Sequence, residues 1–167
     1  MTGANKPAMS FRKLRLRAET PDDLDVIGAV LQDALIPVAD MAYLPEESRF
    51  ALVANRFCWE SGEGEAPSGR VGNTRGAAAH RRVNAGVLFG GVQAVQTRGF
   101  DRDDASNILS LLAIRAEPGL DATEITLICA GAASIRLRAS GIDCRLDDIG
   151  EPWPTAWRPS HEDAEAD

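Results

Sequence analysis

Strict alternation of apolar and polar residues dominates the last third of the chain and predicts β-strands. Ile125, Leu127 and Cys129 occupy alternate positions that we expect to face inward, and a turn near Gly131 reverses the chain. Such period-two patterns are typical of strands with one buried face. The alternation then resumes in an inward-facing series made of Ile135, Leu137, Ala139, Ile142, Cys144 and Leu146. We therefore expect neighbouring antiparallel strands here.

A second alternating series precedes these strands. Four apolar side chains alternate across residues 83–89, and the pair Gly90 and Gly91 that follows allows a bend or a bulge. The stretch "NILSLLAIRAE", residues 107–117, predicts a buried strand. Because no helical pattern separates these segments, the sequence predicts an antiparallel meander, with a curled or barrel-like form as one option.

The clearest helix signal lies in "ETPDDLDVIGAVLQDALIP", residues 19–37. Thr20 suits the N-cap, Pro21 suits the first helical position, and two aspartates follow beside the positive helix end. Apolar residues then recur at helical spacing until Pro37, which cannot extend the run. We expect an amphipathic helix over residues 21–35. The fold class is therefore α+β, a mostly antiparallel sheet with one N-terminal helix.

Residues 40–57, "DMAYLPEESRFALVANRF", predict a β-hairpin with a four-residue turn around Pro45. In that register the facing pairs on the core side are Tyr43 with Phe50 and Met41 with Leu52. The other face then carries Asp40, Ala42, Ala51, Val53 and Asn55. Both faces are apolar enough to need cover. We expect the helix to cover one face, and the second half of the chain or another subunit to cover the other.

Composition along the chain suggests one domain with loose ends. Residues 1–13 are polar and lack periodicity, and residues 160–167, "SHEDAEAD", form an acidic tail. Residues 61–80 lose nearly all large apolar side chains, which predicts a flexible insertion. We expect a single domain over residues 14–159, interrupted by that insertion, with order persisting to about Trp157.

The net charge and the cysteines limit which classes of partner and which cellular compartment are expected. The chain has 18 Lys and Arg against 25 Asp and Glu, a net charge of -7, which disfavours nucleic acid and anionic membranes. No apolar run is long enough to span a bilayer, and the N-terminus has no secretory signal pattern. Cys58, Cys129 and Cys144 form no metal-binding motif, which favours a reducing compartment. We expect a cytoplasmic protein.

Several segments together are similar to a known family. The similarity rests on four segments: "QDA…DMAYLPEESRFALVANRF", "LSLLAIRAEP", "AGAASIRLRASGIDCRLDDIG" and the tail with its tryptophans and prolines. From about Leu14 to Pro159 the chain resembles an alphaproteobacterial family known only as a domain of unknown function. The resemblance implies a bacterial, single-domain, cytoplasmic protein, and it supplies no catalytic residue or cofactor.

Motifs for metal or cofactor chemistry are weak. "DRDDASN", residues 101–107, groups three carboxylates but fails the calcium-loop pattern, because Ala105 and Ser106 stand where a ligand and a glycine are needed. The two histidines, His80 and His161, fall in the predicted insertion and tail, which disfavours histidine metal sites and nucleophile–histidine pairs. We therefore expect no metal and no cofactor.

The best candidate cluster is the polar set around the hairpin: Asp33, Asp40, Tyr43, Arg49, Asn55 and Arg56. Buried polar groups among apolar residues are either paired with one another or used in function. The first hypothesis is a non-catalytic binding or assembly module that forms a homodimer, since apolar residues occupy both hairpin faces. The alternative is a small enzyme with Asp40 as base, Arg49 or Arg56 holding an anionic substrate, and Tyr43 beside them.

Overall fold

The computed structural model describes residues 11–59 and 80–155 of the chain. Its elements are β1 (Arg15–Ala18), α1 (Pro21–Val30), β2 (Leu35–Pro37), the short 3-10 helix η1 (Val38–Asp40), β3 (Met41–Leu44), β4 (Arg49–Phe57), β5 (His80–Gly90), β6 (Val92–Arg98), β7 (Ile108–Pro118), β8 (Thr123–Cys129), β9 (Ser134–Ala139) and β10 (Cys144–Thr155). Residues 1–10, 60–79 and 156–167 lie outside the described residues. Most of the expected lead-in, nearly all of the insertion, Trp157 and the tail fall there.

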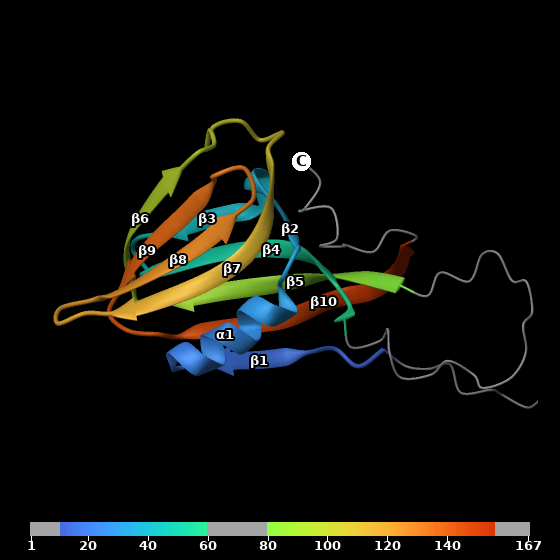
Figure 1. Ribbon diagram of the computed structural model, residues 1–167, viewed down its shortest axis with the longest axis horizontal. Coiled ribbons are helices and arrows are strands. Elements are labelled where there is room, and N and C mark those ends of the chain that lie inside the picture. Colours follow the sequence, from blue (N-terminus) through green and yellow to red (C-terminus); the bar gives the residue numbers. More distant parts are fainter. Residues whose placement is uncertain (1–10, 60–79, 156–167) are drawn as a thin grey trace, which may run out of the picture.

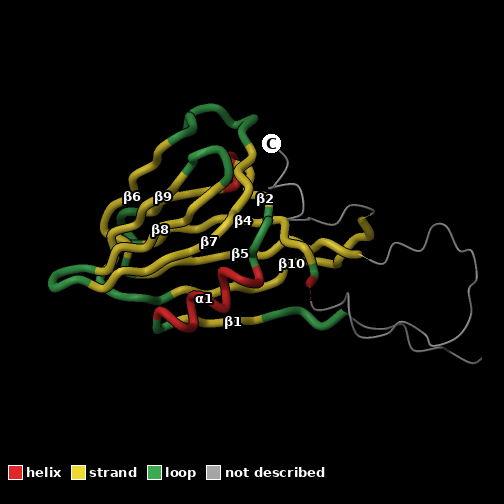
Figure 2. Tube along the Cα trace, viewed as in Figure 1, coloured by secondary structure: helices red, strands yellow, loops and turns green. Residues whose placement is uncertain are grey.

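One curled antiparallel sheet forms most of the molecule (Figures 1 and 2). Its strand order is β1-β10-β5-β4-β2-β7-β8-β9-β6, and β3 adds to β4 beside β2. The expected fold class, a mostly antiparallel sheet with one helix, is confirmed. The barrel option is wrong, because the sheet has two ends, β1 and β6, which do not pair with each other.

The predicted meander holds for only part of the sheet. β7, β8 and β9 are consecutive neighbours, but β9 then pairs with β6, and β10 lies between β1 and β5. The corner between β5 and β6 makes this order possible, because Gly91 has a φ of +70° and a Cβ there would lie 2.5 Å from the Ser140 hydroxyl oxygen. Only glycine meets both conditions without strain. Two strands adjacent in sequence therefore belong to distant parts of the sheet.

The helix begins as predicted and ends early. Thr20 accepts a hydrogen bond from the Asp23 N–H at 3.1 Å, and the Asp23 carboxylate accepts one from the Thr20 N–H at 3.2 Å, which completes a capping box. The helix ends at Val30 instead of residue 35. Asp33 adopts a left-handed φ of 62°, and its N–H donates to the Leu111 carbonyl at 2.7 Å. Strand pairing with β7 thus replaces the last predicted helical turn.

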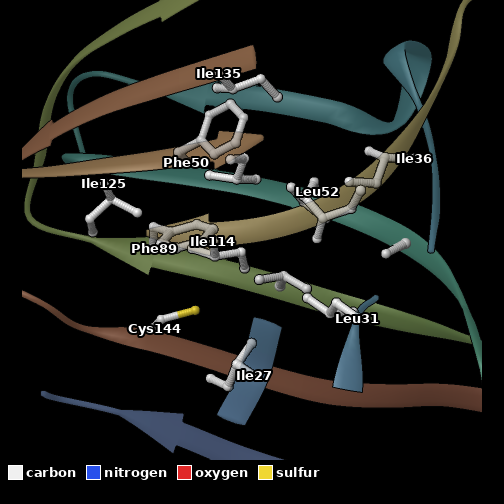
Figure 3. Packing of buried hydrophobic residues seen from close by; sticks show 14 of the residues in the cluster. Ile27, Leu31, Ile36, Phe50, Leu52, Phe89, Ile114, Ile125, Ile135 and Cys144 are labelled. Atoms are coloured by element: carbon white, nitrogen blue, oxygen red, sulfur yellow. The ribbon is translucent and has the colours of Figure 1, made fainter. Parts of the chain in front are cut away.

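The hairpin register is as predicted. Tyr43 faces Phe50 and Met41 faces Leu52, and residues 45–48 form the connection between β3 and β4. The expected cover is different, however. Helix α1 lies against β7 and β1, and the core side of the hairpin packs against the half of the sheet made of β7, β8 and β9 (Figures 1 and 3). The second half of the chain therefore covers the hairpin.

A single hydrophobic core fills the concave side of the curled sheet (Figure 3). Phe50 and Phe89, from neighbouring strands, have ring centroids 6.4 Å apart and are both buried. They meet Ile114, Ile125 and Ile135 from the opposite half of the sheet. The inward series expected at residues 125–146 is buried, except that Ile142 remains partly exposed. The convex side of the sheet is consequently left to carry any binding surface.

Candidate functional site

The six polar residues expected around the hairpin do not form one site. Asp40 lies exposed at the end of η1, and Arg49 lies exposed at the start of β4, with its Nη1 3.6 Å from a Glu47 carboxylate oxygen. Tyr43 is partly buried against the core, and its hydroxyl lies 3.5 Å from the Val92 carbonyl oxygen. Asp33, Asn55 and Arg56 lie near the other end of β4.

The acid–base constellation is not assembled from these residues. Arg49 and Arg56 are seven positions apart on β4, which corresponds to about 23 Å along a strand, and they point to opposite faces. Within the described residues no Lys or Arg nitrogen lies within 4.0 Å of the Asp40 carboxylate. A base and two anion-holding arginines at these positions therefore share no pocket.

Arg56 forms the most deeply buried ion pair among the described residues. Its Nε donates to Asp148 Oδ1 at 2.8 Å and its Nη2 to Asp148 Oδ2 at 2.7 Å, a bidentate geometry, and both side chains are 0% exposed. Asp148 also accepts the Leu14 N–H at 2.8 Å. Because the pair spans β5 above the small side chain of Ala85, it joins β4, β10 and the segment that enters β1.

This pair is a structural clamp. Both side chains are fully buried, and the carboxylate already accepts two guanidinium bonds and a backbone N–H bond, so the pair presents no group to a ligand at the surface. Sequence reasoning placed Arg56 among the polar candidates and missed Asp148. The alternation along the strand could have identified Asp148. Asp148 falls on the same alternate positions as the buried Cys144 and Leu146. Asp143, Arg145 and Asp147 fall on the positions between them, which face outward. A charged residue on the inward parity of a strand requires a buried partner.

A second polar group lies at the same end of the sheet, around Arg82. The Arg82 Nη1 donates to the carbonyl oxygen of Asn55 at 3.2 Å and to its Oδ1 at 3.1 Å, and the guanidinium carbon lies 5.9 Å from the Phe57 ring centroid. Burial lowers the pKa of the Arg82 guanidinium, while the charge of Asp33 acts in the opposite direction. Asn55 and Asp33 therefore do meet at one site, although through an arginine that the sequence analysis did not select.

Aromatic rings adjoin this arginine. The Phe57 ring centroid lies 4.6 Å from that of Trp59 and 5.4 Å from that of His80. His80 was expected in the flexible insertion, but it is the first residue of β5 and pairs with Thr155. β5 extends three residues beyond the apolar series, because ladder bonds to β10 hold residues that lack apolar side chains.

The three cysteines are buried free thiols. Cys58, which follows the last residue of β4, is 1% exposed. Burial raises the pKa of Cys129 to about 11, and burial together with the Asp143 charge raises that of Cys144 to about 12. Thiols with such high pKa values are poor nucleophiles near neutral pH. Across residues 11–59 and 80–155, no group of three His, Cys, Asp or Glu side chains is placed to hold a metal ion.

An apolar area lies on the convex side of β3, β4, β5 and β10. We call it the outer apolar face, and its residues are Ala42, Leu44, Ala51, Val53, Gly86, Leu88 and Ile149. Ile149 is 51% exposed, and its Cδ1 lies over Gly86, where an added Cβ would be 3.1 Å away. Val53 is the neighbour of Gly86 on the other side. The apolar residues are thus continuous across the strands.

Charges of both signs border the outer apolar face. At one edge Arg15 Nε lies 3.1 Å from Asp147 Oδ1, and at the other edge Arg49 lies beside Glu47. All four side chains are at least half exposed. A border that carries positive and negative groups can be complementary to a copy of itself under two-fold symmetry. The hypothesis of a homodimer rested on apolar residues on both hairpin faces. The outer apolar face is the part of the hairpin surface to which that hypothesis applies.

Comparison with known proteins gives a family and no function. No helix within the described ranges is long and apolar enough to cross a membrane. No curated protein matches the chain, and no solved structure matches it. A family model does match, over residues 14–161. The chain therefore belongs to the family described as "Protein of unknown function (DUF2948)".

Proposed function

We propose that this chain is a non-catalytic binding and assembly module that self-associates through its outer apolar face. The observation that carries the proposal is the continuity of Val53, Gly86 and Ile149 across three neighbouring strands on the convex side. Val53 and Gly86 are partly exposed and Ile149 is 51% exposed. Contiguous exposed apolar surface of this kind marks interaction sites on folded proteins.

The size of the face predicts weak association. Four strands at ~4.8 Å spacing and five residues at ~3.3 Å give roughly 19 by 16 Å, or about 300 Å² on each copy. Two such faces bury about 600 Å² in total, less than the roughly 1,000 Å² of a small specific interface, so the charged border has to add contact area. We therefore expect a weak, transient two-fold homodimer in which the mixed charges at the border fix the orientation.

Compartment and partners follow from the same features. Three buried free thiols support a reducing compartment, and we place the module in the cytoplasm of a bacterium. The net charge of -7 opposes non-specific nucleic-acid binding, so the proposed partner is a second copy of the chain. The residues of the acid–base alternative lie apart on the sheet, so no specific observation favours an enzyme.

Sedimentation velocity across a micromolar concentration series tests this proposal. The wild-type chain should show a concentration-dependent shift from monomer to dimer, and Val53→Glu should stay monomeric because it places a charge in the middle of the apolar face. Ile108→Glu is the matched control, since Ile108 is 61% exposed on β7 outside the face. A monomer at every concentration, or equal loss of dimer in both variants, contradicts the proposal.

A further inference from the structure

The gap where the sheet fails to close is a second feature of the convex side, separate from the outer apolar face. β6 pairs with β9 on one side, and β3 pairs with β4. Within the described chain, residues 93–98 make no backbone hydrogen bond outside the ladder with β9. Only the start of β6 is tied down, through the Val92 N–H to the Ser48 carbonyl at 2.8 Å. The remaining edge of β6 is therefore open to another strand.

A small hollow lies between these two open strands. It has a volume of about 170 Å³ and is lined on one side by Met41 and Tyr43 of β3 and on the other by Val95 and Thr97 of β6. Arg102 and Asp103 add one charge of each sign to the lining. Small-molecule sites typically exceed about 300 Å³. The hollow is therefore better suited to the small apolar side chains of an extended segment than to a compact ligand.

Arginines surround the same strand on its outward face. Arg136 and Arg138 on β9 lie beside Gln96 and Ala94 of β6, and Arg98 follows at the next outward position of β6. Outward positions on one strand repeat every 6.6–6.8 Å or so. Arg98 and Arg138 form no ion pair with any described residue, and Arg136 shares one with Glu124 at 3.2 Å while remaining half exposed. Glu124 faces Arg138 in the register of β8 and β9, so the positive charge is partly balanced at that end. Arg98 and Arg102 line a depression that contains no carboxylate, so the excess of positive charge lies there.

The outward surface beside β6 is hollowed. One depression of about 440 Å³ is lined by two arginines, Arg136 and Arg138, and by two carboxylates, Asp121 and Glu124. A second depression of about 380 Å³ continues past Arg98 and Arg102, shares Arg136 and Gln96 with the first, and has no carboxylate in its lining. Arg138 is the register partner of Ala94 and lines the first depression with it, so the arginine borders β6. Both depressions lie alongside the same strand.

We propose that β6 is a docking site for an extended acidic segment of a partner protein, which adds to the sheet as a strand in the gap beside β3. Strand addition satisfies the open backbone groups of β6. Alternate side chains of the added strand point to opposite faces, so carboxylates at every second position meet the arginines while small apolar residues between them enter the hollow. The charge and the apolar lining together select this alternation.

Nucleic acid fits the site less well. A single strand also carries regularly spaced negative charge, but its bases need aromatic side chains on which to stack. The two outward depressions contain none among their lining residues, and the one aromatic hydroxyl near the gap, that of Tyr43, faces the Val92 carbonyl. The acidic peptide is consequently the occupant that the surface favours.

Binding of a labelled heptapeptide to the full chain tests the inference, with glutamate at its odd positions and valine at its even positions. The matched probe is the isomer that has all glutamates in one block, which has the same charge and composition. We expect the alternating peptide to bind at least tenfold more tightly. Hydrogen exchange should slow at amides of residues 93–98 on binding and stay unchanged at the other sheet edge, β1.

Arginine variants identify the surface. Arg98→Gln and Arg138→Gln break no ion pair, and each should weaken peptide binding roughly fivefold, the effect of about 1 kcal/mol. Arg145→Gln, an exposed arginine on β10, should leave binding unchanged. Equal affinity for both isomers, unaltered exchange at residues 93–98, an equal loss in the Arg145 variant, or tighter binding of a single-stranded oligonucleotide would each overturn the proposal.

Discussion

Removal of the Arg56 side chain should destabilise the protein more than removal of any exposed arginine. Arg56→Met keeps most of the apolar stem and deletes the guanidinium that makes two bonds of 2.7–2.8 Å to Asp148. The carboxylate of Asp148 then stays fully buried without its cation. Breaking one side of a buried pair costs about 3–5 kcal/mol. A domain of this kind has about 5–15 kcal/mol in total, so the variant should be close to unfolding.

The double variant Arg56→Met with Asp148→Leu distinguishes the cost of leaving one buried charge unpaired from the cost of losing the ion pair altogether. It removes both charges and leaves the Leu14 N–H, which Asp148 accepted at 2.8 Å, without that partner. One unsatisfied buried donor costs about 1–3 kcal/mol. We therefore expect the double variant to be more stable than Arg56→Met alone by about 2 kcal/mol, since an apolar replacement of a buried pair is often tolerated.

Urea unfolding followed by tryptophan fluorescence measures these free energies. Arg49→Met is the control on the same strand, since its pair with Glu47 spans 3.6 Å and is more than half exposed, and it should cost less than about 1 kcal/mol. The slopes of the unfolding curves should agree among variants if the change lies in the folded state. A loss below 1 kcal/mol in Arg56→Met, or a double variant no more stable than the single, would refute the clamp.

Three further predictions concern local features. The pKa of Asp23 lies below 3.8, chiefly because backbone N–H groups ahead of α1 donate to its carboxylate. Its contribution to stability is therefore present above pH 3.8 and is lost as the pH falls through the lower pKa of the folded state. Asp23→Asn should flatten that part of a pH titration of unfolding, and an unchanged titration contradicts the cap. Gly91→Ala should lower the free energy of unfolding more than Gly131→Ala does in thermal unfolding. Both glycines have a positive φ, which costs an L-residue about 1–2 kcal/mol, but only Gly91 also has an oxygen 2.5 Å from the new Cβ. Equal losses would show that the contact relaxes. Cys129 and Cys144, with pKa values raised to about 11 and about 12, should not react with iodoacetamide at pH 7.5 until the chain unfolds, and mass spectrometry showing native labelling would contradict their burial.

Local sequence determined the features whose interactions lie close along the chain. The capping box at Thr20 and Asp23 needs only four consecutive residues, so it was readable without the fold. The hairpin register followed from a short turn that fixes which residues face each other, as in the pair of Tyr43 and Phe50. Inward alternation at Ile125 and Leu127 likewise reports a buried face whatever strand lies beside it.

Tertiary structure decided which strands became neighbours and therefore which polar residues met. Alternation says that a strand has an inner face and not what it pairs with, so it could not show that β10 would lie between β1 and β5. Arg56 and Asp148 are 92 positions apart, and only that strand order brings them together across β5. The early end of α1 has the same origin, since Asp33 bonds to Leu111 on β7. Long-range backbone pairing outweighed a local helical preference because propensities of less than 1 kcal/mol per residue yield to a ladder of hydrogen bonds and a buried face.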